Sequence, residues 1–293
     1  MKTLLAALML VPFGLVAADA PVRVAVANYP LKYFTERLAG SHVQVVYPVP
    51  ADEDPAFWKP KDDDVAAFQQ ADLIIMNGAT YSKWADKVTL PRRKTVDTAA
   101  GFKDKFIVVA NATKHSHGPG GEHSHSGTAF TTWLDLQQAI AQAQVVSEAL
   151  AKKLPAAKDE IEKNFAALRT DIEALDTRLA AAGKKLAGQP LVASHPVYQY
   201  LARRYSLNLK DVLWEPEEVP TAEQMGDLKK LVAGHPAKWM IWEGEPAKES
   251  VAKVQTLGLQ SIVFDPCGNT PEGGDWLSVM KDNVAALEKI TAP

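Results

Sequence analysis

The stretch from residue 157 to residue 183 constrains the architecture more than any other part of this chain. Its apolar side chains are spaced alternately by four and three residues, at Ile161, Phe165, Leu168, Ile172, Leu175 and Leu179. This spacing predicts one α-helix with a narrow apolar face and charged residues around the rest. Pro155 limits the helix at one end and Gly183 offers a C-terminal stop. At 1.5 Å per residue the helix is about 40 Å long, roughly the span of a small domain.

Two interpretations of this helix are open. The heptad spacing is compatible with a coiled-coil dimer, although the segment barely reaches the three or four heptads that a sustained coiled coil needs. The preferred interpretation is a strut that joins two lobes, one encoded before it and one after it. We therefore expect an N-terminal lobe at 19–154, a linking helix at 155–184 and a C-terminal lobe at 185–293.

The beginning of the chain predicts export. Lys2 precedes an apolar run from Leu4 to Val16, and small residues follow. The run is too short for a membrane span and is typical of a secretory signal peptide. We expect a signal peptide at 1–18, cleavage after Ala18, no membrane insertion and a periplasmic location.

Composition narrows the range of partners and activities. A net charge of −3 argues against nucleic acid and anionic membranes as partners. Cys267 is the one cysteine, so no internal disulfide can form. Neither an HExxH motif nor a glycine-rich phosphate loop is present. We therefore expect a binding protein and not an enzyme.

Short apolar runs alternate with helical stretches on both sides of the strut. The predicted strands are 22–28, 43–49, 73–76 and 106–110 before it, and 190–193, 211–214, 239–242 and 261–264 after it. The predicted helices are 31–39, 62–71, 196–205, 221–233, 246–257 and 275–290. This alternation predicts an α/β protein with two lobes, each a parallel sheet flanked by helices.

In parallel sheets, ligands bind beyond the carboxyl ends of the strands. His195 follows the strand at 190–193 and Asp265 follows the strand at 261–264, so both are expected to project into one cleft. Glu243 follows the strand at 239–242 and points to the same end. It could be a metal ligand or a hydrogen-bond acceptor for His195, or simply a carboxylate at a helix start.

A loop at 114–126 concentrates four of the seven histidines, namely His115, His117, His123 and His125. Neutral imidazole is the commonest metal ligand in proteins. A Gly-Pro-Gly-Gly centre allows the two His-Ser-His pairs to fold toward each other. The alternative is an exposed loop with no specific site.

Four short motifs carry a resemblance to a known family. They are Asp54-Pro55-Ala56-Phe57-Trp58-Lys59-Pro60, Thr131-Thr132-Trp133-Leu134-Asp135, Ser194-His195 and Asp265-Pro266-Cys267-Gly268. With them the mature chain resembles, over essentially its whole length, the periplasmic binding proteins of zinc and manganese ABC transporters, the cluster A-I solute-binding family. The resemblance implies two lobes joined by a rigid helix, a monomer, and delivery of a divalent metal to the membrane permease of an ABC transporter. Zinc is favoured over manganese as the transported ligand because the available ligands are mostly imidazole.

The chain departs from the family pattern at two of these motifs. The resemblance implies a site of three histidines and one carboxylate, but Ala56 and Thr131 stand where two of the histidines would be. Alanine cannot bind a metal and a neutral hydroxyl is a poor zinc ligand. We hypothesise that His123 or His125 reaches into the cleft and completes the site.

Two alternative functions follow from these departures. The protein could be a periplasmic metal buffer or chaperone that binds metal through the loop at 114–126 alone. The cleft could instead take a metal chelate or another small organic ligand, because Trp58 and Trp133 flank the two replaced positions.

Overall fold

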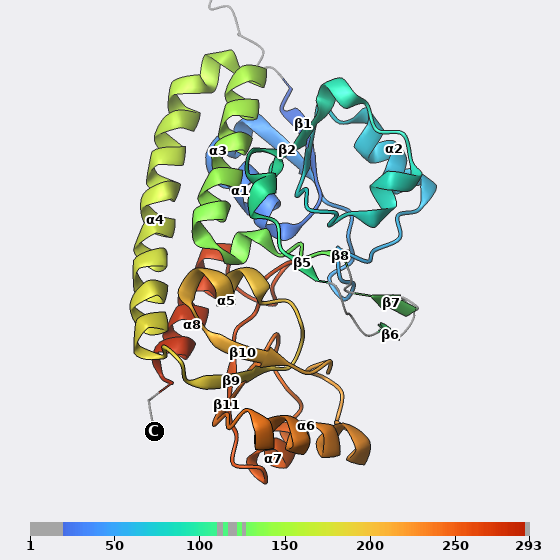
Figure 1. Ribbon diagram of the computed structural model, residues 1–293. Helices are drawn as coiled ribbons and strands as arrows, with labels where there is room; N and C mark the ends of the chain where they lie inside the picture. The colour runs from blue at the N-terminus through green and yellow to red at the C-terminus, as the bar shows by residue number, and fades with distance from the viewer. Residues whose placement is uncertain (1–19, 110–113, 117–121, 125–126, 291–293) are drawn as a thin grey trace, which may run out of the picture.

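The computed structural model describes residues 20–109, 114–116, 122–124 and 127–290 (Figure 1). The expected signal peptide at 1–18 and the loop residues His117 and His125 lie outside the described residues.

The N-terminal lobe is built on a four-stranded parallel sheet with strand order β2-β1-β3-β4. Its strands are β1 (Val22–Val26), β2 (Val43–Val46), β3 (Leu73–Met76) and β4 (Thr95–Asp97). Helix α1 (Tyr29–Ala39) covers one face and α2 (Asp62–Gln70) lies on the other. Alternate residues of β3 enter different cores, with Ile75 beneath α1 and Ile74 beneath α2. At β3 both faces of the sheet are covered, which explains why Leu73–Met76 is continuously apolar.

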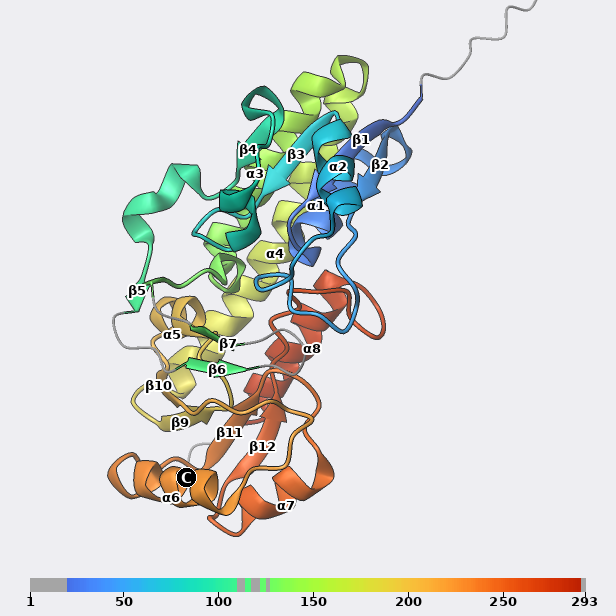
Figure 2. The same cartoon turned by 90° about the vertical axis from the view of Figure 1, so that its right-hand side faces the viewer.

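The C-terminal lobe repeats this plan with strand order β10-β9-β11-β12, again all parallel. Its strands are β9 (Pro190–Ala193), β10 (Asn208–Asp211), β11 (Trp239–Trp242) and β12 (Gln260–Val263). Its helices are α5 (Gln199–Tyr205), α6 (Ala222–Gly234), α7 (Lys248–Gln255) and α8 (Trp276–Glu288). Helices α6 and α7 pack on one face of the sheet, and α5 and α8 on the other (Figure 2).

Helix α4 (Lys158–Lys185) runs along both lobes (Figure 1). It packs against α1 and α3 (Leu136–Lys153) of the first lobe and against α5 and α8 of the second. Most of its apolar stripe, from Ile161 to Leu179, is buried in these contacts, and Phe165 is half-buried. The stripe is therefore used within one chain, and the coiled-coil interpretation is wrong. The predicted fold class, two parallel-sheet lobes joined by a long helix, is confirmed; the exact domain limits stay a prediction.

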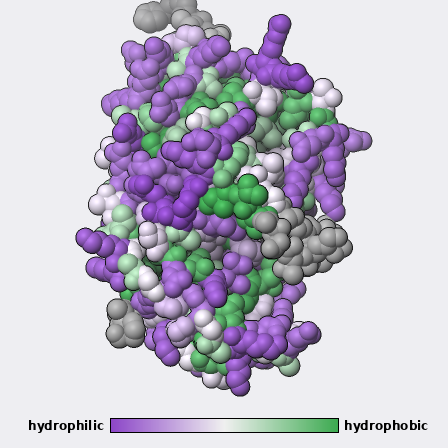
Figure 3. Space-filling view, viewed as in Figure 1, coloured by the Kyte–Doolittle hydropathy of each residue, from purple (hydrophilic) through white to green (hydrophobic). Residues whose placement is uncertain are grey.

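The prediction of a buried strand at 106–110 is wrong. Strand β5 (Val108–Val109) pairs antiparallel with β8 (Gly127–Thr128) outside the main sheet, and Val108 is 76% exposed. The fourth strand of the sheet is β4, which was not predicted. In Figure 3 an apolar patch near the middle of the molecule coincides with the position of β5 in Figure 1, and most of the remaining surface is polar.

The strand predicted at 211–214 begins and ends three residues earlier in the structure, as β10. Trp214 is buried in the core beneath α6 and α7, although it follows the strand. The apolar side chain of Trp214 therefore packs into this core and is not part of a strand. Within the part of the chain that the structure describes, no helix combines the length and apolar composition needed to cross a bilayer.

Candidate metal site in the cleft between the lobes

A cavity of about 280 Å³ lies between the two lobes, where the carboxyl ends of both sheets meet. The N-terminal lobe contributes Asp52, Asp54, Pro55, Tyr81, Phe130, Thr131 and Trp133. The C-terminal lobe contributes His195, Val197, Glu215, Glu217, Glu243, Asp265, Pro266, Gly268 and Asn269. His195, Glu243 and Asp265, which the sequence predicted at one cleft, therefore line the same cavity.

His195 is the centre of the polar part of this cavity. Its side chain is buried, with the residue 2% exposed, and its Nδ1 lies 3.2 Å from Glu243 Oε1 and 3.6 Å from Glu215 Oε1. One ligand atom from each of the three residues can be chosen so that all lie within 4.8 Å of one another. An imidazole with two carboxylates at this separation is a donor set that a divalent metal can use.

Three neighbouring strands position these side chains. Ala193 at the end of β9 is in register with both Ile241 of β11 and Asp211 of β10. Beyond the strands, the Ser194 N–H donates to Ile241 O (2.8 Å), and the Ser194 carbonyl accepts from Trp214 N–H (2.8 Å). His195 and Glu243 each lie two residues beyond the paired positions Ala193 and Ile241, and Glu215 directly follows Trp214. All three residues therefore lie at the same edge of the sheet.

The electrostatics of the cluster favour a cation. Burial raises the pKa of Glu243 well above its usual value, and the negative charges of Glu215, Asp54 and Asp265 raise it further. Burial and the neighbouring negative charges therefore disfavour the ionised form of Glu243 when no cation is present. A bound cation would reverse this preference, because it stabilises the ionised form.

Asp265 is held in place at the end of β12. Its backbone N–H donates to Asn283 Oδ1 (2.9 Å) and its carbonyl accepts from Asn283 Nδ2 (2.6 Å). Burial raises the pKa of Asp265, although its Oδ1 accepts a 2.6 Å hydrogen bond from the Cys267 N–H, which opposes the shift. Cys267 itself is buried.

The two replaced positions of the family pattern have other roles here. Ala56 is buried, and its N–H donates to Asp54 Oδ1 (2.8 Å). The Thr131 hydroxyl donates to the carbonyl of Val197 across the lobe boundary. Neither residue adds a strong metal ligand to the cavity.

The two tryptophans separate in the structure. Trp133 lines the cavity, and its indole N–H donates to Pro266 O (2.7 Å). Trp58 packs edge-on against Trp84 in the core beneath α2, with ring centroids 5.8 Å apart, and does not line the cavity.

The histidine loop contains a short antiparallel hairpin, β6 (Lys114–Ser116) with β7 (Glu122–Ser124). The backbones of His115 and His123 are directly paired in it. The expectation that His123 or His125 enters the cleft stays a prediction.

Sequence reasoning missed Glu215 and Glu217 as cavity residues. Glu215 had a usable signal, because it follows the apolar run at 211–214 that was predicted as a strand. The rule that pointed to His195 and Glu243 would also have selected Glu215.

Two parallel-sheet lobes joined by one long helix, with an imidazole–carboxylate cluster between them, define a two-lobed solute-binding protein. Residues 24–290 match the profile of the family described as "Zinc-uptake complex component A periplasmic". The chain belongs to this family, which confirms the resemblance found from its motifs.

Relatives and solved structures agree with this assignment. The chain is 26% identical over 287 residues to the zinc-binding lipoprotein AdcA of Streptococcus pneumoniae, covering 94% of this chain but 56% of AdcA. It thus spans little more than half the length of that relative. It is 25% identical to the high-affinity zinc uptake system protein ZnuA of Bacillus subtilis, with 91% and 86% of the two chains covered. It is 27% identical to the manganese ABC transporter substrate-binding lipoprotein PsaA of Streptococcus pneumoniae, with 92% and 87% covered.

The fold is shared with the Zn(II)-bound ZnuA-like domain of Streptococcus pneumoniae AdcA. The TM-score is 0.77 at 23% identity, covering 92% of this chain and 99% of that domain.

Proposed function

We propose that the protein captures a divalent metal ion, zinc in preference to manganese, in the cleft and delivers it to the membrane permease of an ABC transporter. The observation that carries this proposal is the buried imidazole of His195, whose Nδ1 lies within 3.6 Å of two carboxylates in a cavity between the lobes. Relatives whose names describe zinc binding, zinc uptake and manganese transport support it.

His195, Glu215 and Glu243 form the core of the proposed site, and Asp265 is the further carboxylate of the same cavity. This set offers one nitrogen and several oxygens, so ligand chemistry alone suits manganese as well as zinc. The preference for zinc therefore rests on the names of two relatives and on the imidazoles of the loop at 114–126. Protons compete with the metal for all of these groups, so we expect affinity to fall as the pH is lowered.

The test is a zinc titration by calorimetry on the mature chain, on a chain lacking 114–126, and on His195→Ala. We expect His195→Ala to lose the tight site, and the loop deletion to lose only weaker equivalents. His42→Ala is the matched control, because His42 is exposed and paired with Glu160 (3.1 Å), away from the cleft. Manganese competition in the same titration measures the preference between the two ions.

A metal buffer remains the second candidate, favoured by the paired backbones of His115 and His123. If only the loop deletion abolishes zinc binding, the cleft is not a metal site and the buffer function replaces the proposal above.

We also propose that the protein acts as a monomer in the periplasm, without catalytic activity. Burial of the α4 stripe within one chain supports a monomer, because the stripe then has no free face for a partner helix. Sedimentation of the mature chain tests this: a dimer at micromolar concentration contradicts it.

A further inference from the structure

We infer that the cleft takes its metal together with a small organic chelator, neutral or amine-bearing, so that the bound species is a cationic metal complex. This inference rests on the proposed metal-binding function and names the chemical form of its ligand. Three properties of the cavity carry it: its size, the arrangement of its two walls, and its charge.

The cavity is larger than a single ion requires. Its volume is about 280 Å³, and a water molecule takes a share of about 30 Å³ in the liquid, so roughly nine water-sized groups fit. The ligand atoms of His195, Glu215 and Glu243 lie within 4.8 Å of one another. A metal held by them at bond lengths of about 2 Å fills only a small part of this volume. The remaining space can hold the carbon skeleton of a chelator.

The wall contributed by the N-terminal lobe suits an organic group. Tyr81, Phe130 and Trp133 line it and pack edge to face, with ring centroids 5.4 Å apart for Tyr81–Phe130 and 5.6 Å for Tyr81–Trp133. The indole N–H of Trp133 is engaged by Pro266 O, which fixes that ring across the lobe boundary. An aromatic wall facing a polar cluster is typical of sites for small organic molecules.

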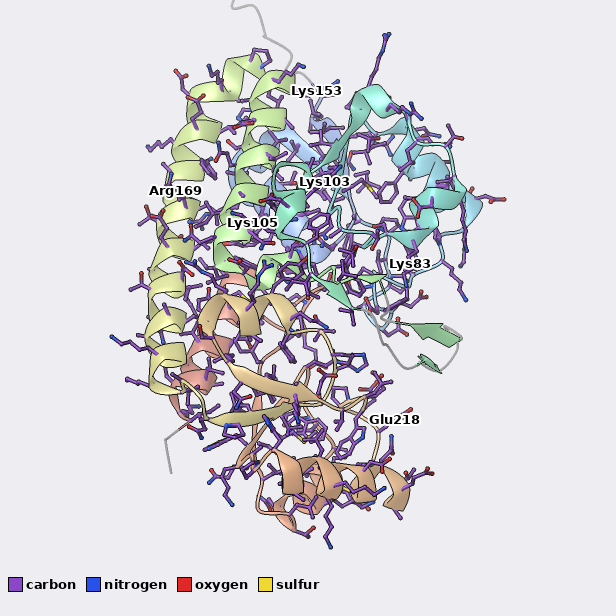
Figure 4. The ribbon with its side chains drawn as sticks, viewed as in Figure 1. Lys83, Lys103, Lys105, Lys153, Arg169 and Glu218 are labelled. Atoms are coloured by element: carbon purple, nitrogen blue, oxygen red, sulfur yellow. The ribbon has the colours of Figure 1, made fainter. Side chains whose placement is uncertain are left out.

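The charge of the cavity selects among chelators. Six carboxylates line it: Asp52, Asp54, Glu215, Glu217, Glu243 and Asp265. Among the described residues that line the cavity, none is lysine or arginine. Lys83, on the side of the N-terminal lobe that faces the other lobe (Figure 4), interacts electrostatically with Asp54 but is not part of the lining.

A divalent ion offsets only two of these negative charges. A polycarboxylate chelator would add more negative charge to the cavity and be repelled. A chelator that binds zinc through amine or imidazole nitrogens leaves the zinc–chelator complex positively charged. Such nitrogens can also fill the zinc coordination positions that the protein ligands leave open.

The experiment compares three zinc species on the intact mature chain at matched free zinc: zinc alone, zinc with L-histidine, and zinc with citrate. Native mass spectrometry reports which species is bound and calorimetry reports the affinity. We expect a 1:1:1 protein–zinc–histidine complex, bound at least tenfold more tightly than zinc alone, and no complex that retains citrate. The inference is overturned if only protein–zinc is detected and histidine lowers zinc occupancy as a simple competitor. Retention of citrate as strongly as histidine would refute the charge argument.

A pair of variants tests the aromatic wall. Phe130→Leu shortens it and should weaken binding of the zinc–histidine complex at least threefold relative to zinc alone. Phe102→Leu is the matched control, because Phe102 is equally buried but packs on Phe106 outside the cavity. An equal effect of both variants would reduce the role of Phe130 to general packing. The proposed function fails in a different way: no zinc-containing species forms in any mixture, and His195→Ala behaves as the unmodified chain.

Discussion

Nδ1 of His195 lies 3.2 Å from Oε1 of Glu243, and this contact joins the carboxyl ends of the neighbouring strands β9 and β11. In metal sites, a carboxylate on the second ring nitrogen fixes the tautomer and the orientation of a ligating histidine. Glu243 can act in this way or bind the metal itself. In both roles, the affinity for zinc depends on the negative charge of Glu243.

Replacing that charge should weaken metal binding. We expect Glu243→Gln, which keeps the shape of the side chain, to lower zinc affinity about 10–100-fold. The measurement is competition with a zinc-responsive dye. Glu249→Gln on α7 is the control, because Glu249 is exposed and paired with Lys253. An unchanged affinity in Glu243→Gln would place the metal away from His195.

The same carboxyl should make the metal-free protein less stable as the pH rises. Burial raises the pKa of Glu243 above its usual 4.5, so the folded state binds a proton more tightly than the unfolded state. Stability is then lost as the pH rises from about 4.5 through the folded pKa. We expect metal-free Glu243→Gln to melt at a higher temperature than the unmodified chain at pH 7.5, with the difference shrinking toward pH 4.5.

Differential scanning calorimetry of EDTA-treated proteins between pH 4.5 and 8 measures this difference. Added zinc should reverse the order of the two melting temperatures, because the unmodified chain binds it more tightly. Parallel melting curves across the whole pH range would show that Glu243 ionises without cost in the folded protein.

Gly183 should resist substitution although it lies inside a helix. A Cβ at this position would lie 2.3 Å from the carbonyl oxygen of Tyr205, because α4 and α5 approach closely there. We expect Gly183→Ala to lower the free energy of unfolding by about 1–3 kcal/mol. Gly226→Ala in α6 is the matched control: nothing lies within 4 Å of its added Cβ, so it should gain about 0.5–1 kcal/mol. Urea unfolding of both variants measures these free energies. A Gly183→Ala variant that is more stable than the unmodified chain would contradict the close approach of α4 and α5.

Asp176 of α4 ties both lobes to the strut. It is 8% exposed and accepts hydrogen bonds from Arg204 (2.7 Å), Tyr205 (2.8 Å) and Gln137 (2.7 Å). Burial alone would raise the pKa of Asp176, but these hydrogen bonds outweigh it and the pKa is lowered. A lowered folded pKa stabilises the protein above the usual value of 3.8, and this stabilisation is lost as the pH falls below it.

We therefore expect Asp176→Asn to lower the free energy of unfolding at pH 7 by about 2 kcal/mol, a modest figure because Arg204 is partly solvated. The difference should narrow below pH 3.8. Urea unfolding at pH 7 and pH 3 measures it. Asp227→Asn, an exposed residue paired with Lys230, should change little. Equal losses in both variants would mean that the network around Asp176 contributes no more than a surface ion pair.

The sequence predicted the elements that are buried on both sides. Leu73–Met76 and Trp239–Trp242 were predicted with their observed bounds, because a central parallel strand leaves an unbroken apolar run. The prediction failed at β4, one edge of the N-terminal sheet. Thr95–Asp97 carries too weak an apolar pattern to be recognised, whereas the run at 106–110 was apolar but lies outside the sheet.

Part of the site was predicted because the ends of the apolar strands could be recognised from the sequence. His195, Glu243 and Asp265 follow central or edge strands of one sheet, so a local rule brings them to one edge. Glu215 directly follows the run predicted as a strand at 211–214, so the same rule covers it, although the strand itself ends at Asp211.

The sequence by itself determined two parallel-sheet lobes, the helix between them, and a histidine–carboxylate pair at the cleft, since each depends on the periodicity or position of residues along one segment. Only the tertiary structure decided what surrounds that pair: Glu215 and Glu243 beside the imidazole, an aromatic wall from the other lobe, and a glycine inside α4 where Tyr205 approaches. These features depend on distances between residues far apart in the chain, which are fixed by strand pairing within the C-terminal sheet and by packing of the two lobes against the common helix.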